Sequence, residues 1–166
     1  MIESLRESSE TIAALAELLV EATALGASVG FLHPLDPEKA AAFWRASLSE
    51  AAAGRRIVLG ARDGGALVGT VTLVFAQPEN QPHRADVQKL LVARSHRRRG
   101  IGQRLMAEAE SCAAHSGRSL LVLDTATADA ARLYERTGWN LTGDVPGYAL
   151  LPNGEPCATT IYWKTV

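Results

Sequence analysis

Glycines and arginines gather in one segment of the chain, between Val87 and Leu105. An apolar stretch leads into three consecutive arginines, Arg97, Arg98 and Arg99. Gly100 and Gly102 follow at the start of a helical pattern. The first N–H groups of a helix have no partner within it, the helix dipole adds partial positive charge there, and glycine lets a ligand come close. This arrangement predicts a site that binds a phosphate-rich anion.

Two common phosphate-binding motifs do not fit this segment. A dinucleotide-binding fingerprint needs a third glycine where Leu105 stands, and a P-loop needs Gly-Lys-Ser/Thr, which the segment lacks. The pattern Arg97-x-x-Gly100-x-Gly102 instead resembles Gln/Arg-x-x-Gly-x-Gly/Ala, the coenzyme-A signature of the GCN5-related N-acetyltransferases, or GNAT superfamily. The resemblance implies an enzyme that uses acetyl-CoA as its co-substrate and no metal.

A second motif supports this resemblance. The run from Ala130 to Trp139, Ala-Ala-Arg-Leu-Tyr-Glu-Arg-Thr-Gly-Trp, resembles the superfamily pattern Ala-x-x-Leu-Tyr-x-x-x-Gly-Phe. Within the superfamily the chain is most similar to the tabtoxin-resistance acetyltransferases, through segments that include the substrate side: residues 26–31, 84–90, 123–125, 146–148 and 161–165. These shared segments imply a small amino-acid-like or toxin-like amine as the acetyl acceptor.

The resemblance also implies which residues hold the cofactor. Backbone groups of the strand that ends at Val92 are expected to pair with pantetheine and to polarise the thioester oxygen. The full set expected to bind the cofactor is Leu90, Leu91, Val92, Arg97, Arg98, Arg99, Gly100, Ile101, Gly102, Gln103 and Thr127. The chain departs from the superfamily at two positions, with Arg94 where proline is frequent and Thr127 where asparagine is frequent. The second departure leaves in question the contact that an asparagine amide makes to coenzyme A.

Three residues are candidates for proton transfer. Tyr134 matches the general acid of the superfamily, which protonates the leaving sulfur. A primary amine, with a free pKa of roughly 10.4, is mostly protonated at neutral pH, so its attack on the thioester is helped by a base. Asp86 and Asp124 are the candidate bases, acting directly or through water. The structural alternatives are a packed Tyr134, a solvated Asp86, and an Asp124 that caps the turn at Thr125.

Three aromatic residues are candidates for the acceptor pocket: Phe31, Trp44 and Tyr148. Their alternative role is packing alone. The glycine-rich apolar loop 26–34 and the last hairpin, residues 148–161, are expected to be the segments that close over a small acceptor. The four histidines have no nucleophile partner nearby in sequence and are expected to be structural or surface residues.

The composition limits the functions that fit. The chain has 166 residues, 47% of them apolar, which is enough for one sizeable core and too short for two ordinary domains, so residues 1–166 are expected to form a single N-acetyltransferase domain. Seventeen basic and 18 acidic side chains give a net charge of -1, with no general attraction to nucleic acid or acidic membranes. Cys112 and Cys157 are the only cysteines and make no metal pattern, and no signal peptide or membrane span is visible, so a reducing cytoplasm is expected.

The expected elements give an α/β fold. A short opening strand precedes an amphipathic helix that ends near Gly26, and Asp36-Pro37 begins a second helix that runs to about Ala53. Strands are expected at 56–62, 66–75, 84–92, 119–124, 139–149 and 159–164, with Asp63-Gly64 as the signal of the first hairpin turn. Helices are expected to start at position 101, with Cys112 on its core face, and to run over 128–136.

The element order predicts a mixed sheet with antiparallel strands first and helices on both faces. The strand–helix–strand unit from position 84 to 124 implies a parallel pair whose carboxyl ends open at the same edge. In the superfamily these two strands splay apart. The predicted architecture is therefore a GNAT-like acetyltransferase fold.

Rival functions remain at this point. A protein N-terminal or peptide acetyltransferase would need an open acceptor groove instead of a closed pocket. An acetyl-CoA sensor would bind the cofactor without catalysis. A sensor has no need of Tyr134, so the presence of this tyrosine argues against that alternative. A nucleic-acid-binding module built on residues 94–104 fits the net charge poorly. The expected partners are acetyl-CoA and a small amine, without nucleic acid or membrane, and the chain is expected to be a monomer or a homodimer.

Overall fold

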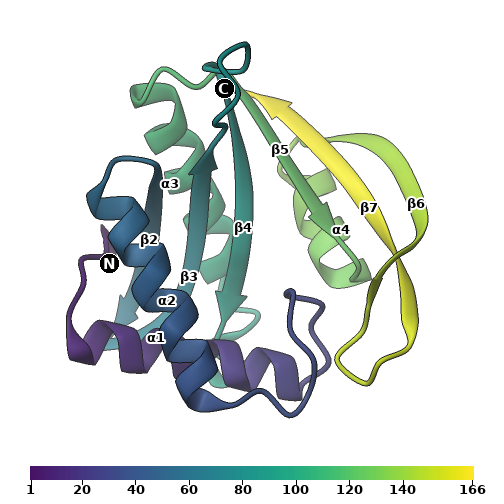
Figure 1. The fold of residues 1–166 in the computed structure, drawn as a ribbon. Helices are drawn as coiled ribbons and strands as arrows, with labels where there is room; N and C mark the ends of the chain where they lie inside the picture. The colour runs from purple at the N-terminus through teal and green to yellow at the C-terminus, as the bar shows by residue number, and fades with distance from the viewer.

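The computed structural model describes residues 1–166 as one seven-stranded sheet with helices on both faces (Figure 1). The strand order is β1-β2-β3-β4-β5-β7-β6. The strands are β1 (Ile2–Ser4), β2 (Arg56–Asp63), β3 (Ala66–Phe75), β4 (Arg84–Val92), β5 (Leu120–Thr125), β6 (Asn140–Leu150) and β7 (Pro156–Thr165). The helices are α1 (Ser9–Ala24), α2 (Pro37–Ala52), α3 (Ile101–His115) and α4 (Ala128–Arg136). The predicted α/β architecture is confirmed.

Helices α1 and α2 cover one face of the first four strands. Ser8 and Asp36 cap the two helices, each accepting a hydrogen bond from a backbone N–H of the first turn. Gly26 follows α1 with φ of 83°, the left-handed conformation that suits glycine after a helix. One core cluster lies here and includes fully buried Trp44.

Helices α3 and α4 lie on the other face, where the second core cluster joins them to β2–β5 and β7. The helical face of α3 differs slightly from the predicted one. Met106 and Ala113 are fully buried, whereas Cys112 is only half-buried and lies near Glu108, with 3.8 Å between its Sγ and the Glu108 Oε1. The 3.6-residue period drifts around the helix, so the last turn buries Ala113 instead of its neighbour.

Two turns refine the predicted hairpins. In the first hairpin Asp63 still pairs with Ala66, so the two loop residues are Gly64 and Gly65, with φ of 55° and 88°. Positive φ at both positions is the requirement of the tightest hairpin turns, and two glycines meet it without strain. A single-turn 3-10 helix, Arg94–His96, also stands between β4 and α3, where no element was predicted.

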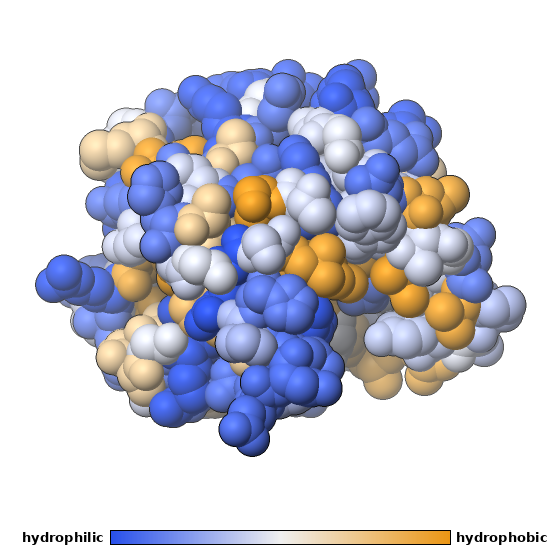
Figure 2. Space-filling view, turned by 90° about the horizontal axis from the view of Figure 1, so that it is seen from above, coloured by the Kyte–Doolittle hydropathy of each residue, from blue (hydrophilic) through white to orange (hydrophobic).

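The last hairpin, β6 and β7, supplies two strands of the sheet beyond β5. β7 lies between β5 and β6 and is antiparallel to both, so β6 forms one edge of the sheet and β1 the other. The carboxyl ends of β4 and β5 point downward in Figure 1. The opposite end, seen from above in Figure 2, is mostly hydrophilic, with apolar residues in small separate groups. None of the helices has the length and hydropathy required to cross a membrane.

Candidate active site

The two central parallel strands, β4 and β5, separate partway along their length, and we call the region bordered by their diverging ends the cleft. Their parallel pairing is limited to Arg84–Asp86 against Leu120–Val122, after which the two strands diverge (Figure 1). Gln88 on β4 and Asp124 on β5 are exposed, although both belong to central strands of the sheet. Exposed side chains in central strands show that no other element is packed over these two positions. The predicted splayed parallel pair is confirmed.

Asp86 lies at the closed end of this cleft. Its carboxylate pairs with the guanidinium of Arg84 on the same strand, and its side chain is 31% exposed. Burial raises the pKa of Asp86 above the ordinary value of an aspartate; the positive charge of Arg84 opposes this rise and the negative charge of Asp124 adds to it. Asp86 is thus half-buried and paired rather than a freely solvated strand residue.

Asp124 lies farther along the cleft, on β5. Its Oδ2 accepts a hydrogen bond of 2.9 Å from the hydroxyl of Thr159 on β7. No backbone N–H donates to this carboxylate, so Asp124 does not cap the turn at Thr125. The charge of Asp124 influences the pKa of three groups on other elements: Asp86, Lys89 and Tyr134. The charge of Asp124 therefore reaches groups on both β4 and α4.

Tyr134, the candidate acid, lies on α4. Its ring is buried against Tyr162 and Trp139, with centroids 5.8 and 5.9 Å away. Its hydroxyl makes no hydrogen bond to the protein and is not fully enclosed, so the ring packs while the oxygen reaches open space. Burial, with a smaller contribution from Asp124, strongly raises the pKa of Tyr134. The phenol therefore keeps its proton at neutral pH.

Lys89 is a functional candidate that the sequence analysis missed. It has φ of 53°, in the left-handed region, at an irregularity where β4 has an extra residue opposite β3. The ammonium lies 5.4 Å from the centroid of Phe43 on α2. Burial lowers the pKa of Lys89, and Asp124 opposes this effect. The available signal was a lone cation inside the apolar run Val-Gln-Lys-Leu-Leu-Val.

The predicted anion-binding site, which we call the cradle, is the turn from residue 97 to 103 at the start of α3. Gly100 has φ of 74° and Arg98 has φ of 64°, so two left-handed residues bend the backbone just before the helix. The Arg104 N–H pairs with the carbonyl of Gly100 at 3.1 Å. The N–H groups of residues 98–103 have no backbone acceptor. A Cβ on Gly100 would meet nothing within 4 Å. The cradle therefore has both free donors and open space for a phosphate.

Gly102 has a different role from Gly100. A Cβ on Gly102 would contact Leu133 of α4 at 3.5 Å and Val92 of β4 at 3.8 Å. These are ordinary contact distances, so a Cβ at this position would fit against both neighbours. The structure brings this glycine close to the end of β4 and to Leu133 of α4. Thr127 caps α4 by accepting from the Ala130 N–H at 3.4 Å.

The three arginines before the cradle point in different directions. The Arg97 Nε donates to the carbonyl of Val92 at 3.2 Å, so Arg97 folds over the end of β4. Arg99 lies 3.9 Å from the carboxylate of Asp63. Arg98 is the left-handed residue of the turn. Arg97 thus borders the cleft, whereas Arg99 is turned toward β2.

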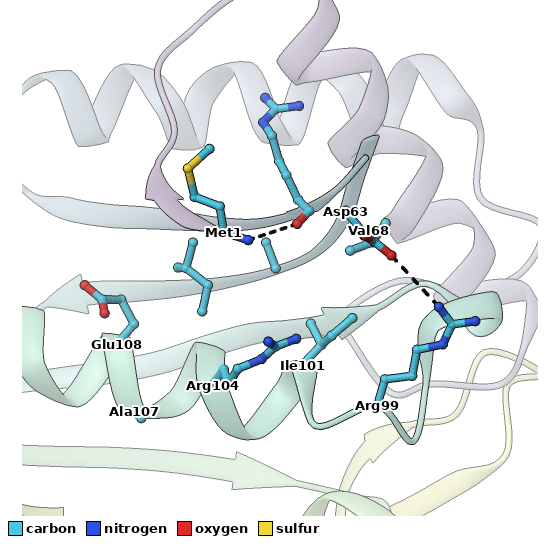
Figure 3. A pocket seen from close by; sticks show the side chains of 11 residues that line it. Met1, Asp63, Val68, Arg99, Ile101, Arg104, Ala107 and Glu108 are labelled. Atoms are coloured by element: carbon cyan, nitrogen blue, oxygen red, sulfur yellow. Dashed lines mark hydrogen bonds and ion pairs between the residues drawn. The ribbon is translucent and has the colours of Figure 1, made fainter. Parts of the chain in front are cut away.

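Arg99 also lines a separate cavity of about 600 Å³ between α3 and the β1–β3 edge (Figure 3). The N-terminal ammonium of Met1 donates to the carbonyl of Arg62 at 3.1 Å on its far wall. Its other lining residues are Ile2, Ala61, Asp63, Val68, Ile101, Arg104, Ala107 and Glu108. The cavity contains none of the candidate acid or base residues.

The departure from the superfamily at Arg94 has a structural counterpart. The backbone N–H of Arg94 donates to Glu21 Oε2 of α1 at 2.9 Å. A proline has no such donor, so arginine at this position allows a contact between α1 and the turn after β4.

The predicted acceptor residues are not all brought together. Phe31 is half-buried in the loop between α1 and α2 and packs edge-on against Phe43, 5.4 Å between centroids. Tyr148 is 57% exposed on β6. Trp44, however, is fully buried in the core behind Phe43, so the expectation that it lines an open pocket is corrected: tight packing leaves no free surface on its ring.

The two segments expected to flank the acceptor do meet. The backbone N–H of His33, in the α1–α2 loop, donates to the carbonyl of Pro152, in the β6–β7 turn, at 2.9 Å. Pro152 is itself buried. This contact joins the segments that lie on opposite sides of the cleft at the lower end of Figure 1.

Comparison with solved structures shows the same fold. The ribosomal-protein-alanine N-acetyltransferase from Brucella melitensis superposes with a TM-score of 0.82 and 20% identity, covering 100% of this chain and 99% of that chain. A proposed acetyltransferase from Salmonella typhimurium, solved with its cofactor acetyl-CoA, has a TM-score of 0.80 and 17% identity, covering 99% and 94%. A proposed phosphinothricin N-acetyltransferase has a TM-score of 0.77 and 18% identity, covering 100% and 99%.

Comparison with protein-family models adds the sequence relationship. The model of the acetyltransferase (GNAT) family matches residues 13–139, a span that runs from α1 to the end of α4 and includes the cradle and Tyr134. The cofactor pattern and the splayed strands lie within this span. The chain therefore belongs to the acetyltransferase (GNAT) family and is an acetyl-CoA-dependent N-acetyltransferase.

Proposed function

We propose that the protein transfers the acetyl group of acetyl-CoA to the amine of a small amino-acid-like or toxin-like molecule. The observation that carries this proposal is the hydrogen bond between His33 and Pro152, which joins the α1–α2 loop to the last hairpin. A bridge of this kind restricts the space beyond the cleft, which suits a small acceptor better than an extended peptide. The resemblance of residues 26–31, 146–148 and 161–165 to the tabtoxin-resistance acetyltransferases also supports a small acceptor.

The proposed proton transfers use both sides of the cleft. Asp124 or Asp86 accepts the proton of the acceptor amine, directly or through water, so that the amine attacks the thioester carbonyl. Tyr134 then donates a proton to the departing sulfur. The raised pKa of Tyr134 supports an acid role because the phenol stays protonated, and the exposure of Asp124 supports a base in contact with the acceptor.

The proposed cofactor site runs from the end of β4 to the start of α4. The backbone of residues 90–92 pairs with the pantetheine arm, and the turn from 97 to 103 holds the pyrophosphate on its N–H groups. The free donors and open space at Gly100 support this assignment. Thr127, at the cap of α4, borders the same region in place of the asparagine frequent in the superfamily.

A peptide or protein N-terminal acceptor is the second candidate. It is favoured by one observation, the 0.82 TM-score to a protein described as a ribosomal-protein-alanine N-acetyltransferase. The 20% identity of that pair supports the fold alone. The phosphinothricin N-acetyltransferase described above supports the small-acceptor reading at a similar level of likeness.

We also propose that residues 1–166 act as one N-acetyltransferase domain. The support is the single sheet, in which strands from both ends of the chain take part, with β1 at one edge and β6 at the other. The loops that meet beside the cleft also come from both parts of the chain, the α1–α2 loop from the first and the β6–β7 turn from the last. We expect a monomer or a homodimer, which light scattering at micromolar concentration distinguishes.

A panel of amines, assayed by release of free CoA, tests the proposal. The panel contains α-amino acids, their carboxamides, toxin-like amino acids, and short peptides with a free N-terminus. We expect small amino-acid-like amines to give the highest kcat/KM. Preferential acetylation of peptides would instead support the second candidate. Absence of turnover with every amine, combined with acetyl-CoA binding, would identify a sensor.

A further inference from the structure

Lys89, a cation without a carboxylate partner, lies on the same strand as Asp86. It has no carboxylate within salt-bridge distance, in contrast to Arg84, which is paired with Asp86. Its ammonium instead faces the ring of Phe43 at 5.4 Å. A partly buried ammonium without a counter-ion leaves hydrogen-bonding capacity unused.

The bulge in β4 is the reason that Lys89 points this way. Before the bulge, Ala85 and Val87 belong to the core cluster on the α3 side of the sheet. Strict alternation would put the side chain of residue 89 on that side as well. The left-handed backbone at Lys89 and the register shift in β4 turn it to the α2 side instead. The backbone thus accepts an unfavourable conformation to place one cation.

The α1–α2 loop leaves room for this ammonium. Gly30 has φ of 85°, and a Cβ at that position would lie 3.7 Å from the Lys89 Nζ. A larger side chain there would fill the space beside the ammonium. The loop that carries Gly30 is also the one that His33 ties to the last hairpin. Lys89 therefore faces the α1–α2 loop, at the end of the cleft where we expect the acceptor to bind.

A carboxylate of opposite charge, Asp124, lies on β5. Asp124 is two residues beyond Val122, the last β5 residue that pairs with β4. Leu121 and Leu123 belong to the α3-side core, so alternation places Asp124 on the same side of the sheet as Lys89. The effect of Asp124 on the pKa of Lys89 agrees with this placement.

A cation and carboxylates on one wall of a cleft complement a zwitterion. The ammonium of an α-amino acid and its carboxylate are separated by one carbon, so both charges meet partners only where a cleft offers both signs. Asp86 and Asp124 offer the negative sign, and Lys89 offers the positive one. Arg56 is the other cation that influences Lys89, and its guanidinium donates to the hydroxyl of Ser47 on α2 at 3.1 Å.

We propose that Lys89 binds the carboxylate of an acceptor that carries its amine on the adjacent carbon, and so selects amino-acid-like acceptors. This inference rests on the proposed function and narrows it to amines with a neighbouring carboxylate. Lys89 is a specificity-determining residue here and takes no part in proton transfer.

Substitution of Lys89 by methionine tests this inference. Methionine keeps the length of the side chain and removes the charge. For an α-amino acid we expect kcat/KM of Lys89→Met to fall about 10- to 100-fold, mainly through KM, because a charge-assisted hydrogen bond is lost. For the carboxamide of the same amino acid we expect little change, and Lys89→Arg should restore part of the preference.

Lys39→Met is a matched control. Lys39 also lies over an aromatic ring of this region, 5.9 Å from the centroid of Phe31, but it is exposed on α2. We expect the control to leave the preference for the carboxylate unchanged. Thermal unfolding of both variants checks that they are folded. A uniform loss with the amino acid and its carboxamide in Lys89→Met would overturn the inference, since it would indicate a general electrostatic role.

A binding measurement separates this inference from the proposed function. Calorimetry of N-acetyl amino acids and their carboxamides, titrated into the enzyme with CoA, reports carboxylate recognition without turnover. We expect tighter binding of the free carboxylate by the wild type and equal binding by Lys89→Met. If only peptides are acetylated but this difference persists, the proposed function fails while Lys89 recognition stands. Equal binding by the wild type would refute the role of Lys89.

Discussion

The chemistry of the cleft depends on a few side chains whose surroundings differ sharply. Tyr134 has a packed ring and a free hydroxyl, Asp124 is exposed, and Asp86 is half-buried beside Arg84. These differences separate a buried phenol, whose pKa is raised, from two carboxylates in more open or paired surroundings. Pairs of titratable groups with divergent environments are the usual mark of an acid and a base.

Tyr134→Phe is expected to reduce kcat while leaving acetyl-CoA affinity nearly intact. Phenylalanine keeps the packing against Tyr162 and Trp139 and removes only the hydroxyl. General acid catalysis contributes roughly 10²–10⁴-fold, and a thiolate with a thiol pKa of about 8.5 leaves fairly well without help, so the loss should lie within or somewhat below that range. Single-turnover kinetics and calorimetry measure the two quantities.

Wild-type speed in Tyr134→Phe, under conditions in which chemistry limits the rate, would make Tyr134 a core residue. The pH profile gives a second check. The pKa of Tyr134 is raised, so its proton is retained up to and beyond the ordinary tyrosine value of about 10. We therefore expect no loss of kcat from ionisation of this phenol below that pH.

The acid side of the pH profile identifies the base. A base works as the carboxylate, so activity is present above its pKa and is lost as the pH falls through it. Because the pKa of Asp86 is raised, a base at this position loses activity at higher pH than an ordinary aspartate would. Arg84→Met removes the opposing positive charge, and we expect it to move this acid limb to still higher pH.

Arg118→Met is the control, since Arg118 lies over the ring of Phe75 and forms no salt bridge with Asp86, which pairs with Arg84. The pH dependence of kcat/KM for Arg84→Met, Asp86→Asn and Asp124→Asn decides between the two carboxylates. An acid limb that Arg84→Met does not move, but Asp124→Asn abolishes, would assign the base to Asp124. Wild-type rates at neutral pH in both asparagine variants would exclude both residues.

At the scale of elements, the junction between β4 and α3 combines a strand end, a left-handed turn and a helix start. The turn needs positive φ at Arg98 and Gly100, and only glycine adopts it without strain. The result is a set of backbone N–H groups that face open space at the mouth of the cleft. Anion binding here depends on backbone geometry more than on any one arginine.

Gly100→Val is expected to weaken acetyl-CoA binding and to cost about 1–2 kcal/mol of folding stability. No atom lies within 4 Å of the new Cβ, so the stability cost comes from the left-handed backbone and not from a clash within the protein. The loss of affinity comes from the β-branched side chain, which projects into the space for the pyrophosphate. Calorimetry and urea unfolding measure the two effects.

Gly54→Val is a closely matched control for this substitution. Gly54 also has φ of 74° and open space around its Cβ, but it lies after α2 and outside the cradle. We expect a similar loss of stability and unchanged acetyl-CoA affinity. Equal affinity losses in the two variants would point to a general effect of strain, and unchanged affinity in folded Gly100→Val would contradict the cradle.

At the scale of the whole molecule, two segments from opposite ends of the chain meet near the diverging ends of β4 and β5. The α1–α2 loop comes from the first quarter of the sequence and the β6–β7 turn from the last, and the hydrogen bond from His33 to Pro152 joins them. The sheet makes this contact possible because β7 lies between β5 and β6. The turn that joins β6 to β7 can then reach the α1–α2 loop.

Shortening the last hairpin tests this closure. Leu150 pairs with Pro156, so replacing residues 151–155 by Asn-Gly leaves a two-residue turn that fits the strand pair. The variant loses the acceptor of the His33 N–H. We expect KM for small amines to rise about fivefold, as loss of roughly 1 kcal/mol implies, with acetyl-CoA affinity unchanged and acetylation of peptides increased.

Replacing Gly64-Gly65 by Asn-Gly in the first hairpin is the control, because that turn joins β2 and β3 and does not supply the acceptor of the His33 N–H. It should alter neither KM nor the preference for small amines. An unchanged KM in the shortened last hairpin would show that the bridge does not shape the acceptor site.

Much of the fold and half of the site follow from local sequence. Helix starts at Asp36 and Thr127, the two glycines of the cradle and the ends of β4 depend on short-range rules, because capping, positive φ and side-chain alternation involve neighbours along the chain. The cofactor side therefore lies within one continuous segment, where spacing alone is informative.

The acceptor side was decided by tertiary structure. Trp44 and Phe31 were equivalent aromatic candidates in the sequence, but packing buries the first completely and leaves the second partly open. Lys89 reaches the cleft only through a bulge whose side-chain direction breaks alternation, and its neighbours Gly30 and Asp124 come from distant segments. Local spacing determines which backbone donors face a ligand, whereas burial and the register between distant strands determine which side chains do.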